Sequence, residues 1–181
     1  MKTKSMTLCA VFAAVMCVFC VITIPIGPVP VTLGVFAVLL TAVILGPKLG
    51  AISVLVYILL GAVGLPVFSG FKGGFQILLG PTGGYIWSYI LMALLIGFLT
   101  ITLPDNKWLA MLKIFTACLA GIIVCYALGT VQFMLVQKTG LTESLGLCVI
   151  PFIPFDIGKA AAASYLGFTV KNALVKSNFI D

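Results

Sequence analysis

The feature that most constrains this chain is a succession of long apolar runs, separated by short segments rich in Pro, Gly and Lys. Hydrophobic residues make up 62% of the 181 residues, and charged residues only 8%. A typical soluble domain carries about 25% charged residues. Since a membrane helix needs roughly 20 apolar residues, this length predicts a single domain of about six spans. We therefore expect an all-α integral membrane protein, with residues 1–181 forming one transmembrane domain.

Breaks at Pro, Gly and Lys set the expected bounds of the spans. Three prolines in residues 25–30 end the first helix, and the GPKLG turn at residues 46–50 joins the second to the third. The polar link QKTGLTES, residues 137–144, leads to the last. The expected spans are residues 5–24, 31–45, 51–64, 83–103, 109–136 and 147–170.

Lysine placement predicts the orientation in the membrane, because cytoplasmic loops carry an excess of basic residues. With the N-terminus inside, Lys72 and Lys138 fall outside. The lysines that fall on the cytoplasmic side are Lys2, Lys4, Lys48, Lys107, Lys171 and Lys176. We therefore expect both termini on the cytoplasmic side of the cell membrane. The basic residues are scattered and form no patch, which argues against nucleic acid as a partner.

Asp156 and Lys159 give the strongest chemical signal, because both fall inside the last expected span. Each costs roughly 2.5–3.5 kcal/mol near the bilayer centre, so ionisable residues there are functional candidates. Their i,i+3 spacing places them on one face of a helix. If that helix starts near Leu147, they lie roughly 13 and 18 Å into the membrane. They form either a self-neutralising ion pair in the core or a binding site, and we favour the site.

The glycine-rich segment of residues 64–85, between the third and fourth spans, is too apolar for a solvated external loop. Its glycines let the backbone approach a ligand closely, so we expect a folded cap or re-entrant segment over an external pocket. Irregular backbone at membrane depth is tolerated only against protein or a water-filled cavity, and Pro151 and Pro154 therefore argue for a cavity near Asp156. Residues 25–31 are a second, stiffer candidate lid. The alternative is that both segments are rigid connectors.

Several motifs are absent, and their absence limits the function. The chain has no G-x-x-x-x-G-K-[ST] phosphate loop, so we expect it not to hydrolyse ATP itself. It has no histidine and no cluster of carboxylates for an intramembrane metal hydrolase. The six cysteines lie in apolar sequence and are expected to behave as small hydrophobic residues. We expect no enzyme activity, no metal and no cofactor.

Five motifs in this chain resemble the BioY family: GLPVF (64–68), GG (73–74), LLGPTGGY (78–85), PVPVTL (28–33) and LGPKLGAISV (45–54). BioY proteins are the biotin-specific, substrate-binding S components of energy-coupling factor (ECF) transporters. The resemblance covers nearly the whole chain and implies a six-helix S-component fold that binds biotin from outside. It also implies a membrane T component and two cytosolic ATPases as partners, which explains the missing phosphate loop. Because some BioY proteins work without the ATPases, a homo-oligomer remains an alternative.

The resemblance also implies which residues bind the ligand. Asp156 and Lys159 match the family's ligand-binding pair: a carboxylate suits the ureido N–H groups of biotin, and an ammonium suits its valerate. Lys72 is a departure from the family pattern that can reach biotin and is an alternative partner for the valerate. The remaining residues expected at the pocket are Gly73, Gly74, Gly83, Gly84 and Tyr85.

Ala10 and Ala14 form an A-x-x-x-A pair, which lets another helix pack closely and matches the family's contact with the T component. Gly34 and Ile86 are further departures: the family pattern has glutamine at the first position and can have a polar or basic residue at the second. Both bear on ligand contacts rather than on the fold. The alternatives are an S component for another small vitamin, a proton-coupled carrier working alone, and an intramembrane enzyme.

Overall fold

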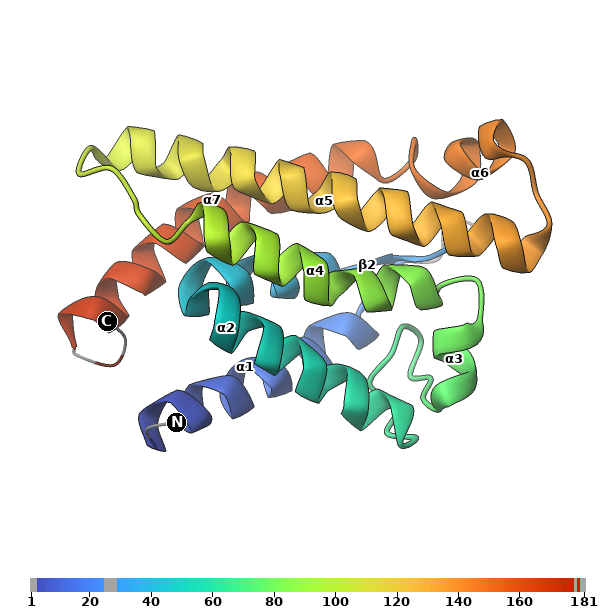
Figure 1. Ribbon diagram of the computed structural model, residues 1–181, viewed down its shortest axis with the longest axis horizontal. Coiled ribbons are helices and arrows are strands. Elements are labelled where there is room, and N and C mark those ends of the chain that lie inside the picture. Colours follow the sequence, from blue (N-terminus) through green and yellow to red (C-terminus); the bar gives the residue numbers. More distant parts are fainter. Residues whose placement is uncertain (1–2, 25–28, 178, 180–181) are drawn as a thin grey trace.

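The computed structural model describes residues 3–24, 29–177 and 179, and is built mainly of helices (Figure 1). Two short strands, β1 (Thr23–Ile24) and β2 (Val31–Thr32), pair antiparallel after the first helix. Apart from this hairpin, the prediction of an all-α chain is confirmed. The helices are α1 (Thr3–Val21), α2 (Gly34–Ala62), α3 (Phe75–Leu79), α4 (Gly83–Leu99), α5 (Lys107–Gln137), α6 (Leu141–Cys148) and α7 (Ile153–Lys176).

Helix α2 contains the second and third expected spans and folds back on itself between them. Gly46 has φ 74 and ψ −173, outside the helical region, and Pro47 follows it. Glycine adopts such a positive φ without the steric cost of a Cβ atom. Beyond the reversal, a Cβ atom on Gly50 would lie 3.3 Å from the Cα atom of Ala42, so the two arms of α2 touch. The turn expected at GPKLG is therefore confirmed.

The helical segments run back and forth, so that α1 begins and α7 ends at the same end of the bundle, here termed the terminal end (Figure 1). The turn of α2 lies there too, against the last part of α4: a Cβ atom on Gly97 would contact the backbone of Gly46 and Pro47. The opposite end carries α6 and the segment of residues 64–82. We term this segment, which includes α3, the cap. Helix α2 packs against α1, α4 and α7, while α5 packs against α4 and α7.

The number of membrane spans is harder to fix than the helices themselves. By length and apolar composition, three helices of the described chain (α1, α2 and α5) are able to cross a membrane, and the bent pair α6–α7 would be a fourth. Helix α4 is apolar but has only 17 residues. Counting the arms of α2 separately, each expected span has a helical counterpart. The count of six complete crossings stays a prediction.

The last span does not begin where the sequence predicts. A helix from Leu147 is expected after a polar link of residues 137–144, but the second half of that link is already part of α6. The two helices are bent by 52°, and α7 begins only at Ile153. Asp156 therefore lies in the first turn of α7. The expected depth of roughly 13 Å assumes an unbroken helix from Leu147, and that assumption is wrong.

Candidate ligand-binding site

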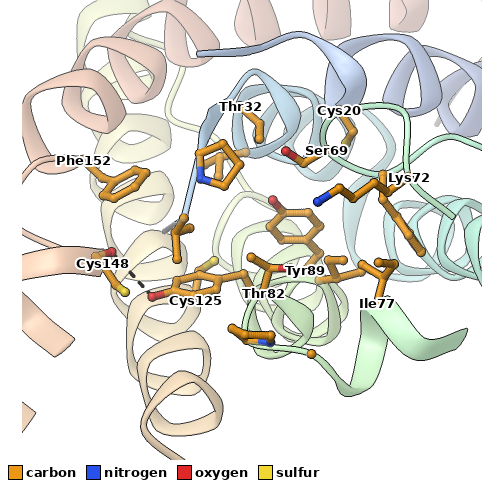
Figure 2. Close-up of a pocket in the computed structure, with 18 of the residues that line it drawn as sticks. Cys20, Thr32, Ser69, Lys72, Ile77, Thr82, Tyr89, Cys125, Cys148 and Phe152 are labelled. Atoms are coloured by element: carbon orange, nitrogen blue, oxygen red, sulfur yellow. Dashed lines mark hydrogen bonds between the residues drawn. The ribbon is translucent and has the colours of Figure 1, made fainter. Parts of the chain in front are cut away.

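A cavity of about 410 Å³ lies at the cap end of the bundle. Pockets for small molecules typically measure about 300–1,000 Å³ and combine a mainly apolar wall with a few polar groups. The wall of the cavity comes from the end of α1, the hairpin, α2, the cap, α4, α5, the end of α6 and the first part of α7. Figure 2 shows side chains from this wall around a common space. Segments far apart in the sequence thus build one compartment of the size that suits a small molecule.

Asp156 and Lys159 line this cavity and form an ion pair. The Lys159 ammonium donates to Oδ1 of Asp156 at 2.7 Å, and the Tyr126 hydroxyl donates to Oδ2 at 2.7 Å. The prediction that both charges share one helix face is therefore confirmed. The first turn of a helix also stabilises a carboxylate through the helix dipole. Since an ionised carboxylate has about four acceptor sites, Asp156 keeps capacity for a ligand.

Two prolines shape the backbone beside Asp156. Pro151 lies in the break between α6 and α7, and Pro154 lies in the first turn of α7, where a missing N–H group leaves no hydrogen bond unmade. Between them, Phe152 lines the cavity, and its carbonyl accepts from the Asp156 N–H group at 2.9 Å. The expectation of irregular backbone next to a cavity is confirmed.

The cap is folded onto the bundle and forms one side of the cavity. Phe68 and Lys72 pair as an antiparallel bridge and close a tight turn, in which Phe71 has a positive φ of 57. Phe68 is buried and meets Tyr57 edge-on, with ring centroids 5.7 Å apart. Its ring also covers Gly61, where any Cβ atom would collide with it. The prediction of a folded segment over a pocket is confirmed, and its role as a lid stays a prediction.

Phe68 packs the cap against α2, and Gln132 bonds the cap to α5. The Nε2 group of Gln132 donates to the carbonyls of Leu78 and Gly80, both at 2.9 Å. The indole of Trp87 also donates to the Leu78 carbonyl, at 3.3 Å. These carbonyls lie at the end of α3, where a helix leaves its C=O groups without partners. Sequence reasoning missed Gln132, because one glutamine near the end of an apolar helix produces no recognisable pattern.

Lys72 extends from the cap into the cavity (Figure 2). Within the described part of the chain its ammonium has no ion pair, whereas Lys159 is paired with Asp156. Of these two lysines, Lys72 is thus the one whose charge the protein leaves uncompensated.

Tyr85 lines the cavity, as the resemblance implies, with its hydroxyl 3.4 Å from Oγ1 of Thr130. Three further tyrosines that the sequence analysis did not single out also line the cavity: Tyr57, Tyr89 and Tyr126. A buried tyrosine needs a partner for its hydroxyl, yet Tyr57 and Tyr126 are each the only tyrosine of an apolar span, and Tyr89 shares its span only with Tyr85. Only the packing of α2, α4 and α5 reveals that they share one wall.

The glycines expected at the pocket do not line the cavity in the described structure. A Cβ atom on Gly83 or Gly84 would collide with the Gln132 side chain, and one on Gly73 would collide with the backbone of Leu65. Gly74 has φ 102, which favours glycine, and precedes α3. These glycines allow close packing of the cap and of α4 against α5, and the structure gives no support for ligand contact by Gly73, Gly74, Gly83 or Gly84.

Ile86 and Gly34, the two further residues at which this chain departs from the family pattern, differ in their position relative to the cavity. Ile86 lines the cavity and is buried. Gly34 lies behind the wall: a Cβ atom there would lie 2.7 Å from Sγ of Cys20, which itself lines the cavity. A glutamine at this position would require Cys20 to move.

The remaining sequence predictions concern a second lid and a partner contact. Of the lid at residues 25–31, residues 25–28 lie outside the described residues, while Val29 and Pro30 line the cavity. Ala10 and Ala14 are exposed on the outer face of α1, where a partner helix has access to them.

Comparison with known proteins gives consistent matches. The sequence model of the BioY family matches residues 1–176. The biotin transporter BioY of Thermotoga maritima is 40% identical over 166 residues, covering 92% of this chain and 95% of its own length. The probable biotin transporter BioY of Pyrococcus horikoshii is 43% identical over 163 residues, covering 90% of this chain and 93% of its own. A crystal structure of the S-component for biotin from an ECF-type ABC transporter matches with a TM-score of 0.84 and 31% identity, over 94% of this chain and 92% of that one. With this agreement in sequence and in fold along nearly its whole length, the chain belongs to the BioY family.

Proposed function

We propose that this chain is the biotin-binding membrane subunit, the S component, of an ECF-type vitamin uptake transporter, and that it is not an enzyme. The observation that carries the proposal is a cavity with a hydrogen-bonding ion pair, an apolar and aromatic wall, and a second, unpaired cation in a member of the BioY family. Relatives of this chain are named biotin transporters.

Biotin has the chemistry that such a cavity suits. Its ureido ring carries N–H donors and a carbonyl acceptor, its thioether ring and alkyl chain are apolar, and its valerate is anionic. Asp156 accepts the ureido N–H groups. Lys159, which has three N–H donors and uses one on Asp156, donates to the ureido carbonyl. The charge of Lys159 is already balanced by Asp156, so the valerate pairs with Lys72, the second of the two partners expected from the sequence.

We place the terminal end in the cytoplasm and the cap on the external face of the cell membrane. The excess of lysines at the terminal end supports this orientation. Energy for uptake comes from the T component and two ATPases, because this chain has no phosphate loop of its own. Ala10 and Ala14 offer an accessible small-residue stripe for the T component.

The test is binding of labelled biotin to the purified chain in detergent, with other vitamins as competitors. We expect saturable binding that unlabelled biotin displaces and other vitamins do not. Lys72→Gln should weaken it, while Lys138→Gln, which removes an exposed charge at the same end of the bundle but away from the cavity wall, should not. A folded chain that binds another vitamin and not biotin would refute the assignment. Uptake that stops with an uncoupler and needs no partner subunit would instead favour a carrier working alone.

A further inference from the structure

A second hollow, of about 550 Å³, lies on the outer side of α4 and α5 at the cap end, next to α3. We term it the lateral groove. Its wall includes Leu79 from α3, Trp87 and Leu91 from α4, and Leu128 and Leu135 from α5. These five side chains remain between 40% and 75% exposed. In a membrane-spanning bundle, such a surface is in contact with lipid or with another protein.

The polar side chains in the lateral groove use their donors within the protein. Trp87 and Gln132 donate to the carbonyl of Leu78, and Ser88 donates to the carbonyl of Tyr85 at 2.6 Å. An occupant of the groove therefore receives no hydrogen bond from these donors. The other side chains of the wall are leucines and valines, and Gly84 has no side chain. A hydrocarbon chain fits this surface without any lost hydrogen bond.

A second copy of the chain fits it less well. Helices that associate in membranes approach closely at small residues such as Gly, Ala and Ser. The groove instead presents mostly leucine, valine and tryptophan side chains. A flexible acyl chain can follow the gaps between such bulky side chains, whereas the backbone of a second helix could not approach this surface closely.

Helix α3 contributes residues to both the lateral groove and the ligand cavity. Gln76 and Ile77 of α3 line the cavity, while Leu78 and Leu79 line the groove. Whatever fills the groove therefore supports the wall of the cavity from behind.

We propose that the acyl chain of a phospholipid, from the leaflet at the cap end, occupies the lateral groove and holds α3 against the bundle, which slows release of the ligand. The part that concerns ligand release rests on the proposed function. Occupancy by lipid does not, and it is measured separately.

Leu128→Trp fills the groove, and Leu135→Trp is a second variant of the same kind. Ile123→Trp is the matched control, since Ile123 is 66% exposed on the same helix but does not line the groove. Native mass spectrometry of protein purified in mild detergent counts bound phospholipid. We expect one phospholipid on the wild type and on Ile123→Trp, and none on either groove variant. Equal lipid retention in all variants would overturn the proposal, as would a wild-type dimer that the groove variants abolish.

Biotin release then tests the link to the cavity. Delipidated wild-type protein should release biotin several-fold faster than protein with phospholipid restored, while Leu128→Trp should release it at one rate in both conditions. Bound lipid with a lipid-independent release rate would refute the link between groove and cavity. If the wild type binds no biotin, the proposed function fails, and the lipid count still decides the occupant of the groove.

Discussion

Because Asp156 and Lys159 form a buried ion pair, we expect replacing both residues to affect protein stability and ligand binding differently. Their side chains are only 4% and 10% exposed. Asp156→Asn leaves the Lys159 ammonium buried without a counter-ion, and removing one partner of a buried pair costs about 3–5 kcal/mol. We expect the free energy of unfolding of Asp156→Asn to fall by that amount.

Lys159→Met should cost less. Asp156 keeps the hydrogen bond from Tyr126 and the favourable helix dipole, so the loss is close to that of one charge-assisted hydrogen bond, about 1.5–3 kcal/mol. The double variant removes both charges together. Coupling energies for residues in direct contact are about 0.5–3 kcal/mol, and the double variant should be more stable than the sum of the single effects by an amount in that range.

The assay combines unfolding by denaturant in detergent with calorimetric titration of biotin on all four proteins. Stability that is partly recovered in the double variant, while biotin binding is lost in every variant, would identify the pair as part of the site. Strictly additive stability effects would refute the ion-pair reasoning. Full biotin binding by the double variant would refute the placement of the ureido ring.

Three further predictions follow from the cap. Lys72→Gln should weaken biotin binding by about 10- to 100-fold, because it removes a charge-assisted hydrogen bond of about 1.5–3 kcal/mol. Biotin methyl ester, which has no carboxylate, should bind the wild type and Lys72→Gln equally. If the ester loses as much affinity as biotin does, Lys72 does not pair with the carboxylate. Gln132→Leu should leave the α3 carbonyls without these donors and speed biotin dissociation several-fold in a stopped-flow chase, and an unchanged rate would exclude Gln132 as a clamp. Gly61→Ala should push Phe68 outward and make the cap more sensitive to limited proteolysis, whereas Gly146→Ala, which has open space around it, should not; equal sensitivity would count against the packing described.

The helices were predictable because the physics of lipid leaves few options. With no water to satisfy the backbone, an apolar run of span length forms a helix, and Gly–Pro breaks mark its ends. The break before α7 was not predictable in the same way. Pro151 and Pro154 fit both an irregular stretch within a span and the start of a new helix, since proline is tolerated in a first turn. Only the 52° bend distinguishes the two.

The role of the glycines could not be read from the sequence for a related reason. Glycine brings a backbone close to a ligand, but it brings a backbone equally close to another part of the protein. At Gly83 and Gly84 the nearby groups include the Gln132 side chain, from a helix some 50 residues further along the chain. A glycine-rich sequence looks the same whether its glycines face a ligand or another part of the protein, so only the tertiary contacts distinguish the two roles.

The choice between Lys72 and Lys159 as partner of a ligand carboxylate shows the same dependence on tertiary contacts. The sequence identifies both lysines, one by its position inside a span and the other by its place in the cap. A lysine within hydrogen-bond distance of a buried aspartate offers little net charge to a ligand. The ammonium of Lys72, an exposed residue that lines the cavity and has no ion pair among the described residues, keeps its full charge for an anion. The 2.7 Å contact to Asp156 balances the charge of Lys159, and this is why our proposal pairs the anionic end of the ligand with Lys72.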